Sequence, residues 1–112
     1  KNAAFMLHQV TERLYCTILL VFTRYKPNSH DLSLLRKLVN SIDNQLASVF
    51  VLEDSEQRRL FKLLKKAYIE ARYKRGYIIT QEELTQLAKQ VEELKKLGKQ
   101  LCLEKINCLS ES

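Results

Sequence analysis

Glycine, proline and tryptophan are scarce in this chain, which has 2 Gly, 1 Pro and no Trp among 112 residues. Few Gly and Pro residues leave few positions for tight turns, and this favours a small number of long helices over many short strands. The abundant Leu, Lys, Glu, Gln and Arg are good helix formers. The length allows one core and no separate catalytic domain. We therefore expect a single helical domain over residues 1–112.

Long apolar segments and a cysteine framework are also missing. The longest largely apolar run, Leu14–Phe22, is bounded by Arg13 and Arg24, whereas a bilayer span needs about 20 apolar residues. The first residues do not have the pattern of a signal peptide. Three cysteines without a Cys-x-x-Cys pair indicate neither a disulfide framework nor a zinc site. We expect a cytoplasmic protein with no membrane contact, no metal and no cofactor.

Apolar residues recur at three- and four-residue steps in four segments, which predicts four helices. The first helix covers about 3–25 and ends at a loop over 26–29, because Pro27 disfavours helical geometry in the residue before it. The second begins at a cap formed by Ser29 or Asp31 and keeps its apolar spacing as far as Val49.

The other two predicted helices begin at clear capping signals. The third starts at Asp54 or Ser55 and ends at Gly76. The fourth starts at the capping box that begins at Thr80, and we expect it to fray after Ile106. Loops of about four to eight residues place neighbouring helices antiparallel, so the predicted fold is an all-α, up-down antiparallel bundle of four main helices.

Positive charge is concentrated in the third predicted helix and its exit. The formal net charge is +6, and the stretch from Gln57 to Tyr77 has Glu70 as its only acidic residue. The basic residues in that stretch are Arg58, Arg59, Lys62, Lys65, Lys66, Arg72, Lys74 and Arg75. Such an excess attracts phosphates, nucleic acid or an acidic partner. For Arg58, Lys62, Lys65 and Lys66 the alternative is a solvated helix face. Its acidic partners would then come from the fourth helix, which carries Glu82, Glu83, Glu92 and Glu93.

Candidate binding residues lie at the exit of the third helix. Arg72 presents a planar fork of donors that suits phosphate oxygens, and the ring of Tyr73 can stack on a base. Lys74, Arg75 and Tyr77 follow at once, so cations and aromatic rings interleave. The alternative is an arginine that braces the bundle and a tyrosine that packs inside it.

A second group of candidates lies in the loop before Asp31. Lys26 and His30 can bind phosphate there, and a histidine near neutral pH can also transfer a proton. A histidine that caps the helix or packs the loop is the alternative. His8, which is flanked by apolar residues and followed four positions later by Glu12, is expected to make a structural hydrogen bond.

Three segments in this order resemble the HEPN family: residues 5–15 with a Gln-x-x-Glu turn, residues 25–32 ending in His30-Asp31-Leu32, and residues 60–73 ending in Ala71-Arg72-Tyr73. The resemblance implies a helical bundle that commonly forms homodimers and is often associated with nucleotidyltransferase domains. It also implies nucleotide binding and, in a toxin-like subset, metal-independent RNA cleavage.

The chain departs from the family pattern in two places. The family has one more helix before the first helix seen here, and the chain starts with Lys1 rather than Met, so we expect a fragment of a longer protein. The nuclease subset has an Arg and a later His near the end of the bundle, but Tyr77 stands where that His is wanted. Arg24 and His30 have the required spacing in a different loop, which makes them weak catalytic candidates.

The sequence leaves three functions open. The first is a nucleotide- or RNA-binding module that uses Lys26, His30 and the 72–77 segment. The second is a metal-independent, RNA-cleaving enzyme that uses Arg24 and His30. The third is a structural module for dimerisation or for interaction with a nucleotidyltransferase domain. We expect binding rather than catalysis, because the nuclease motif is degenerate.

Overall fold

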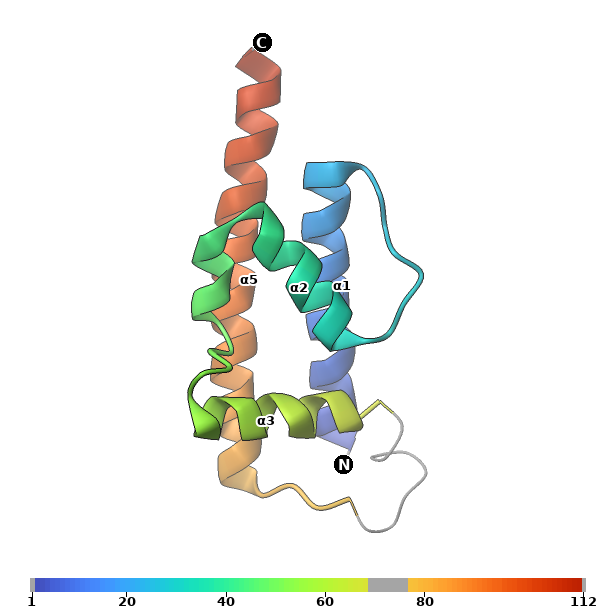
Figure 1. The fold of residues 1–112 in the computed structure, drawn as a ribbon, viewed down its shortest axis with the longest axis vertical. Helices are drawn as coiled ribbons and strands as arrows, with labels where there is room; N and C mark the ends of the chain where they lie inside the picture. Colours follow the sequence, from blue (N-terminus) through green and yellow to red (C-terminus); the bar gives the residue numbers. More distant parts are fainter. Residues whose placement is uncertain (1, 69–76, 112) are drawn as a thin grey trace.

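The computed structural model describes residues 2–68 and 77–111, and all regular structure among them is helical. In chain order the elements are α1 (Asn2–Thr23), α2 (Leu32–Ile42), the 3-10 helix η1 (Asn44–Ser48), α3 (Ser55–Lys66) and α5 (Gln81–Glu111) (Figure 1). The predicted all-α class is therefore confirmed.

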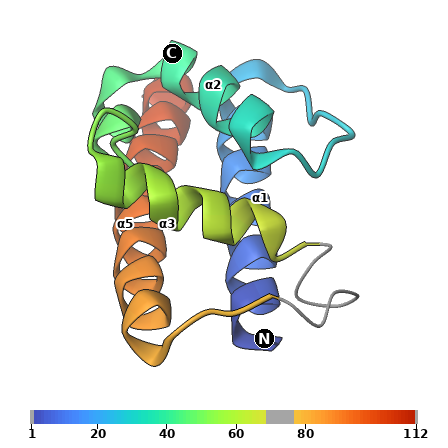
Figure 2. The ribbon, with the colours of Figure 1, turned by 60° about the horizontal axis from the view of Figure 1, so that its bottom comes forward.

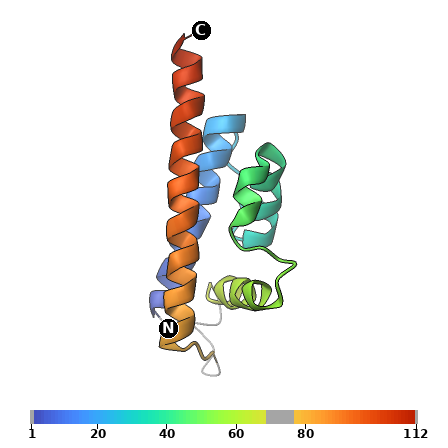
Figure 3. The ribbon, with the colours of Figure 1, turned by 90° about the vertical axis from the view of Figure 1, so that its left-hand side faces the viewer.

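The elements form two layers. The long helices α1 and α5 lie side by side, and α2, η1 and α3 all pack on one side of that pair (Figure 3). Helix α3 crosses both long helices (Figures 1 and 2).

The directions of the long helices correct one expectation. Both α1 and α5 begin at the same end of the bundle and run the same way (Figure 1), so this pair is not antiparallel as an up-down bundle requires. The physical reason is that the two short helices and their connections return the chain to the beginning of α1 before α5 starts.

Two aspartates cap the short helices, as the sequence allowed. The side chain of Asp31 accepts a hydrogen bond from the Ser33 N–H at 3.0 Å. The side chain of Asp54 accepts one from the Glu56 N–H at 2.9 Å. In each case the aspartate, and not the neighbouring serine, satisfies backbone donors that a helix start leaves without partners.

The second predicted helix is shorter than its apolar pattern suggested. Helix α2 ends at Ile42, and the side chain of Asp43 accepts a hydrogen bond from the Gln45 N–H at 2.8 Å to begin η1. Leu46 and Val49 are nevertheless buried, as their spacing predicted. The helix is interrupted at Asp43 because an aspartate side chain competes for nearby backbone donors.

The turn between η1 and α3 is fixed by polar contacts that the apolar pattern could not predict. Phe50 is fully buried and has a φ of 57°, in the left-handed region that non-glycine residues rarely adopt. Its N–H donates to the side-chain oxygen of Gln90 at 3.1 Å, and its carbonyl accepts from Arg36 at 2.9 Å. Both backbone groups of this buried residue are thereby satisfied.

The core lies between the two layers. Of the five residues of α5 at inward spacing, Leu87, Val91, Leu94 and Leu101 are buried, whereas Leu84 is half-buried. In α1 the buried face includes His8 and Tyr15, whereas Tyr25, which the pattern placed on that face, is 66% exposed. Helix α1 ends at Thr23, so Tyr25 lies outside the helix and does not continue its buried face.

Helix α5 does not fray after Ile106, contrary to expectation, but continues to Glu111. Its last buried residue within the described chain is Leu101. The final part of the helix projects past the end of α1 (Figure 1). The projecting part contains neither Gly nor Pro, so no residue type interrupts the helical hydrogen bonds. The exposed apolar residues of α5 after Leu101 are Leu103, Ile106 and Leu109.

Candidate functional site

A cavity of about 370 Å³ lies between α1 and the 24–31 loop. This volume falls near the lower end of the range for ligand pockets, roughly 300–1,000 Å³. Most of the lining residues are polar or charged, and Cys16, Leu20 and Pro27 add apolar surface. They are Glu12, Arg13, Cys16, Thr17, Leu20, Lys26, Pro27, Asn28, Ser29 and His30. Two of the predicted phosphate ligands, Lys26 and His30, therefore line one cavity.

The conformation of the loop follows from its first and last residues. Arg24 has a φ of 60°, and this left-handed geometry ends α1. Pro27 is buried against the bundle, and the Ser29 hydroxyl accepts a hydrogen bond from the Asp31 N–H at 3.1 Å. With both ends fixed, the loop holds Lys26 and His30 above the side of α1.

The ring of His30 is held from two sides. Its Nδ1 pairs with the Glu12 carboxylate of α1. Its face stacks on the ring of Tyr68, just beyond α3, with ring centroids 4.7 Å apart and planes 17° apart. A carboxylate can only accept a hydrogen bond, so Nδ1 carries the hydrogen and Nε2 is the nitrogen left for a ligand. The histidine is thus oriented before any ligand arrives.

His8 is a buried residue that packs against both partners of the His30–Tyr68 stack. It is 1% exposed, makes a hydrogen bond with the backbone of His30, and tilts against Tyr68 at a centroid distance of 5.2 Å. Burial lowers the pKa of His8, although the nearby Glu12 carboxylate opposes the shift. The predicted structural role of His8 is confirmed, but its partner is the loop and not Glu12.

The electrostatics of the cavity favour an anion. Neither Arg13 nor Lys26 makes an ion pair with any residue in the described part of the chain, whereas Glu12 is engaged by His30. Cys16 is not an activated nucleophile, because burial raises the pKa of its thiol and the Glu12 charge adds to that effect. The arrangement suits phosphate binding by two cations and an imidazole.

The other sequence-predicted site residues do not line this cavity. Arg24 is exposed and outside the lining. Tyr77 is 5% exposed, and its hydroxyl donates to the Leu63 carbonyl at 2.8 Å, so its ring packs inside the bundle. Arg72, Tyr73, Lys74 and Arg75 lie outside the described residues.

Sequence reasoning missed the roles of Glu12, Arg13 and Tyr68. The spacing of Glu12 from His8 was noticed, but nothing local pairs Glu12 with a residue eighteen positions away. Arg13 drew attention only as the boundary of an apolar run. Tyr68 was not among the predicted site residues, and its position just beyond α3 brings it to the loop.

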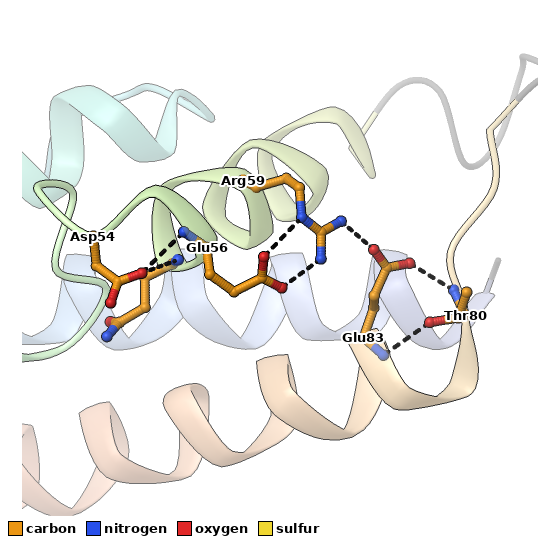
Figure 4. Close-up of polar contacts among 6 residues, drawn as sticks. Asp54, Glu56, Arg59, Thr80 and Glu83 are labelled. Carbon is orange, nitrogen blue, oxygen red and sulfur yellow. Dashed lines mark hydrogen bonds and ion pairs between the residues drawn. The ribbon is translucent and has the colours of Figure 1, made fainter.

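A second polar cluster neutralises one of the predicted cations of α3 (Figure 4). Arg59 donates to both oxygens of Glu56, at 2.6 and 3.2 Å, and also to Glu83 at the start of α5. Hydrogen bonds from Arg59 lower the pKa of both carboxyls. The predicted capping box completes the cluster, since the Thr80 N–H donates to Glu83 at 2.9 Å and the Glu83 N–H donates to the Thr80 hydroxyl at 3.0 Å.

The remaining described cations of α3 are exposed and make no ion pair with other described residues. They are Arg58, Lys62, Lys65 and Lys66. Among the residues that the structure describes, the alternative of glutamate partners from the last helix is therefore not found for these four cations, and Glu83 pairs with Arg59 instead. An exposed cationic face is left beside the neutralised residue.

Within residues 2–68 and 77–111, no cluster of three or more His, Cys, Asp or Glu side chains could hold a metal ion. The same described residues include no helix with the length and apolar character needed to cross a membrane.

Comparison with known proteins places this geometry in a family. No curated protein matches the chain. The family model described as the HEPN domain matches residues 1–101, which end at the last buried residue of α5. The match covers α1, α2, η1 and α3, together with the cavity and the Arg59 cluster. The chain belongs to the HEPN domain family.

Proposed function

We propose that this protein is a nucleotide- or RNA-binding module whose phosphate site is the cavity between α1 and the 24–31 loop. The observation that carries the proposal is the combination of two cations without ion pairs, Arg13 and Lys26, with the oriented ring of His30 around one cavity. Carboxylate partners would cancel such charges, and the described residues supply none to them.

The three groups have complementary tasks. Arg13 offers a fork of donors to two phosphate oxygens, whereas Lys26 offers a mobile point charge. In its doubly protonated form, His30 offers an Nε2–H donor, because the Glu12 carboxylate accepts from its other nitrogen. The segment with Arg72, Tyr73, Lys74 and Arg75 is proposed to add phosphate and base contacts, since it follows Tyr68 in the chain and Tyr68 touches His30.

The exposed cations of α3 suit a ligand longer than one nucleotide. Phosphates of an RNA strand carry evenly spaced negative charge, and each neutralised phosphate steepens the dependence of affinity on salt. Lys62, Lys65 and Lys66 lie on α3, which ends two residues before Tyr68, and so extend positive charge from the cavity along α3. We propose that an RNA backbone follows this direction.

The test is a titration of a labelled single-stranded RNA at two salt concentrations. The paired variant Arg13→Glu/Lys26→Glu is expected to reduce affinity at least tenfold, about 1.4 kcal/mol, and to flatten the salt dependence. The matched control is Lys89→Glu/Lys96→Glu, which changes the net charge equally on α5, outside the cavity. Equal losses in both variants would rule out the cavity as the site.

A second candidate function is metal-independent RNA cleavage. The observation in its favour is the Glu12–His30 pair, since an oriented imidazole can act as a general acid or base. Arg24 lies outside the cavity lining, so Arg13 and Lys26 are better placed than Arg24 to stabilise the phosphate. Incubation with structured RNA and a chelator tests the idea, and equal cleavage by His30→Ala would end it.

Self-association is the third proposal, because the projecting end of α5 exposes apolar side chains. Ile106 and Leu109 are 47% and 50% exposed, beyond the last buried residue of the helix. We propose that they pair in a homodimer, and that the module works beside a nucleotidyltransferase domain, as the family resemblance implies. Sedimentation should show a dimer that Ile106→Glu/Leu109→Glu dissociates. A wild-type monomer at high concentration would contradict it.

A further inference from the structure

A second hollow lies between the two long helices and shares only Thr17 with the lining of the phosphate cavity. It has a volume of about 310 Å³ and is almost entirely apolar apart from its edge. Its lining residues are Leu14, Thr17 and Ile18 of α1 and Lys95, Gly98, Lys99, Cys102 and Leu103 of α5. We call it the α1/α5 groove. No residue of α2, η1 or α3 lines it, and those elements pack together on one side of the helix pair (Figure 3).

Gly98 explains why a groove forms at this place. A Cβ atom at Gly98 would lie 2.9 Å from the Cδ1 atom of Ile18, closer than real Cβ contacts. The missing side chain therefore lets α1 and α5 approach closely, while the larger Leu14 and Leu103 stand on either side. A glycine inside a helix is about 1 kcal/mol less favourable than alanine, so helix propensity does not account for it.

The charge at the edge of the groove has one sign. Lys95 and Lys99 are the charged residues of the lining, and neither makes an ion pair within the described chain. An occupant that fits must be apolar where it meets the floor and anionic where it meets the ammonium groups. A second groove of the same kind supplies no carboxylate, because its lining would bring the same two lysines and no acidic residue to the interface.

We propose that the α1/α5 groove docks an amphipathic helix of a partner protein, with an apolar stripe flanked by Asp and Glu. Two parallel helices form a trough that receives the ridge of a third helix, with anchors at every third and fourth residue. Lys95 and Lys99 are one helical turn apart, which matches acidic residues with the same spacing on the partner. Val10 and Leu103, 40% and 49% exposed, offer further apolar contact along the two helices.

The cysteines of α5 provide the readout. Cys102 lines the groove and is partly buried, whereas Cys108 is exposed further along the same helix. The probe is a synthetic helical peptide of about 18 residues, roughly five turns, with a leucine stripe flanked by glutamates. We expect it to slow alkylation of Cys102 by iodoacetamide several-fold and to leave Cys108 unchanged, as followed by mass spectrometry. The same peptide with lysines for all glutamates should protect neither cysteine.

Charge reversal supplies the decisive comparison. In Lys95→Glu/Lys99→Glu the preference should switch, so that the lysine peptide protects Cys102 and the glutamate peptide does not. Lys89→Glu/Lys96→Glu, on the same helix but outside the lining, should keep the original preference. Equal protection by both peptides, or no switch, overturns the proposal.

Two further results would assign the groove to other occupants and also overturn the proposal. Protection of Cys102 that grows with protein concentration alone would mean that a second copy fills the groove. Protection by decanoate without protection by the glutamate peptide would mean that the groove binds an acyl chain.

Discussion

The two polar regions of the molecule, the Arg59 cluster and the phosphate cavity, differ in whether their arginine makes ion pairs. Beside the start of α5, Arg59 is engaged by Glu56 and Glu83, and a capping box holds Glu83 in place. Along α1, Arg13 opens into a cavity and makes no ion pair with a described residue. Both side chains are exposed and both arginines belong to helices. The two arginines differ in ion pairing because, among the described residues, only Arg59 has carboxylates that are free to pair with it.

This difference separates structural cations from cations available to a ligand. The two carboxylates around Arg59 satisfy its donors, so an incoming phosphate would have to displace a glutamate there. In the cavity, the one carboxylate, Glu12, is already committed to His30. Arg13 and Lys26 are therefore free to bind an anion. Exposure and residue type alone do not distinguish the two regions.

The largest expected effect comes from making the cavity resemble the Arg59 cluster. Thr17→Glu places a carboxylate on the cavity wall, one helical turn from Arg13. We expect the affinity for single-stranded RNA to fall about tenfold, or about 1.4 kcal/mol. Thr17→Gln, with the same shape and no charge, should bind like the wild type. The measurement is fluorescence anisotropy at low salt, and equal losses in both variants would contradict charge as the cause.

A second prediction concerns the support behind His30. Burial lowers the pKa of His8, so the folded protein takes up this proton less readily than the unfolded chain, whose histidine titrates near 6.5. The stabilising contribution is therefore present above pH of about 6.5 and is lost as the pH falls, by up to about 1.4 kcal/mol per pH unit. Urea unfolding of the wild type and of His8→Leu between pH 7.5 and 5.5 measures it. In the variant, the free energy of unfolding should depend less steeply on pH than in the wild type. An unchanged slope would contradict the assignment of this pH dependence to His8.

A third prediction tests the cap that holds the Arg59 cluster. Thr80→Ala removes the oxygen that accepts from the Glu83 N–H and should lower the free energy of unfolding by about 1 kcal/mol. Thr80→Ser keeps that oxygen and should keep most of the stability. RNA affinity should not change in either variant. A loss of affinity in Thr80→Ala would show that the two regions are not independent.

The smallest effect is expected from opening the Arg59 cluster. Glu56→Gln/Glu83→Gln leaves Arg59 without its carboxylates, so the slope of RNA affinity against salt should steepen by about one phosphate contact. Stability should fall slightly, and the loss should shrink at high salt because exposed ion pairs are screened. Leu103→Gln, an uncharged change outside the cluster, is the control for altered surface polarity.

The amount that the sequence could predict varied between elements. The helix starts at Asp31, Asp54 and Thr80 were predictable, because capping depends on residues three or four positions apart. The end of α2 at Ile42 was not, because the buried Leu46 preserves the apolar spacing across the break. The parallel course of α1 and α5 depends on the path of the intervening chain, which local patterns do not encode.

The residues of the candidate site also divide into those that the sequence could suggest and those that it could not. Lys26 and His30 lie in one loop, so a local motif could suggest that they act together. Tyr77 matched the same aromatic and basic pattern, but its hydroxyl bonds to Leu63 inside the bundle. Glu12 and Tyr68 entered the site only through folding, from another helix and from the end of α3.

By itself, the sequence determined that the chain is helical, where its short helices and α5 begin, and that it carries excess positive charge, because these properties depend on composition and on neighbours a few positions apart. Only the tertiary structure decided which charges remain available. Whether an arginine meets a carboxylate depends on helices that are distant in sequence, and Coulomb attraction acts at contact distance in space, whatever the separation along the chain.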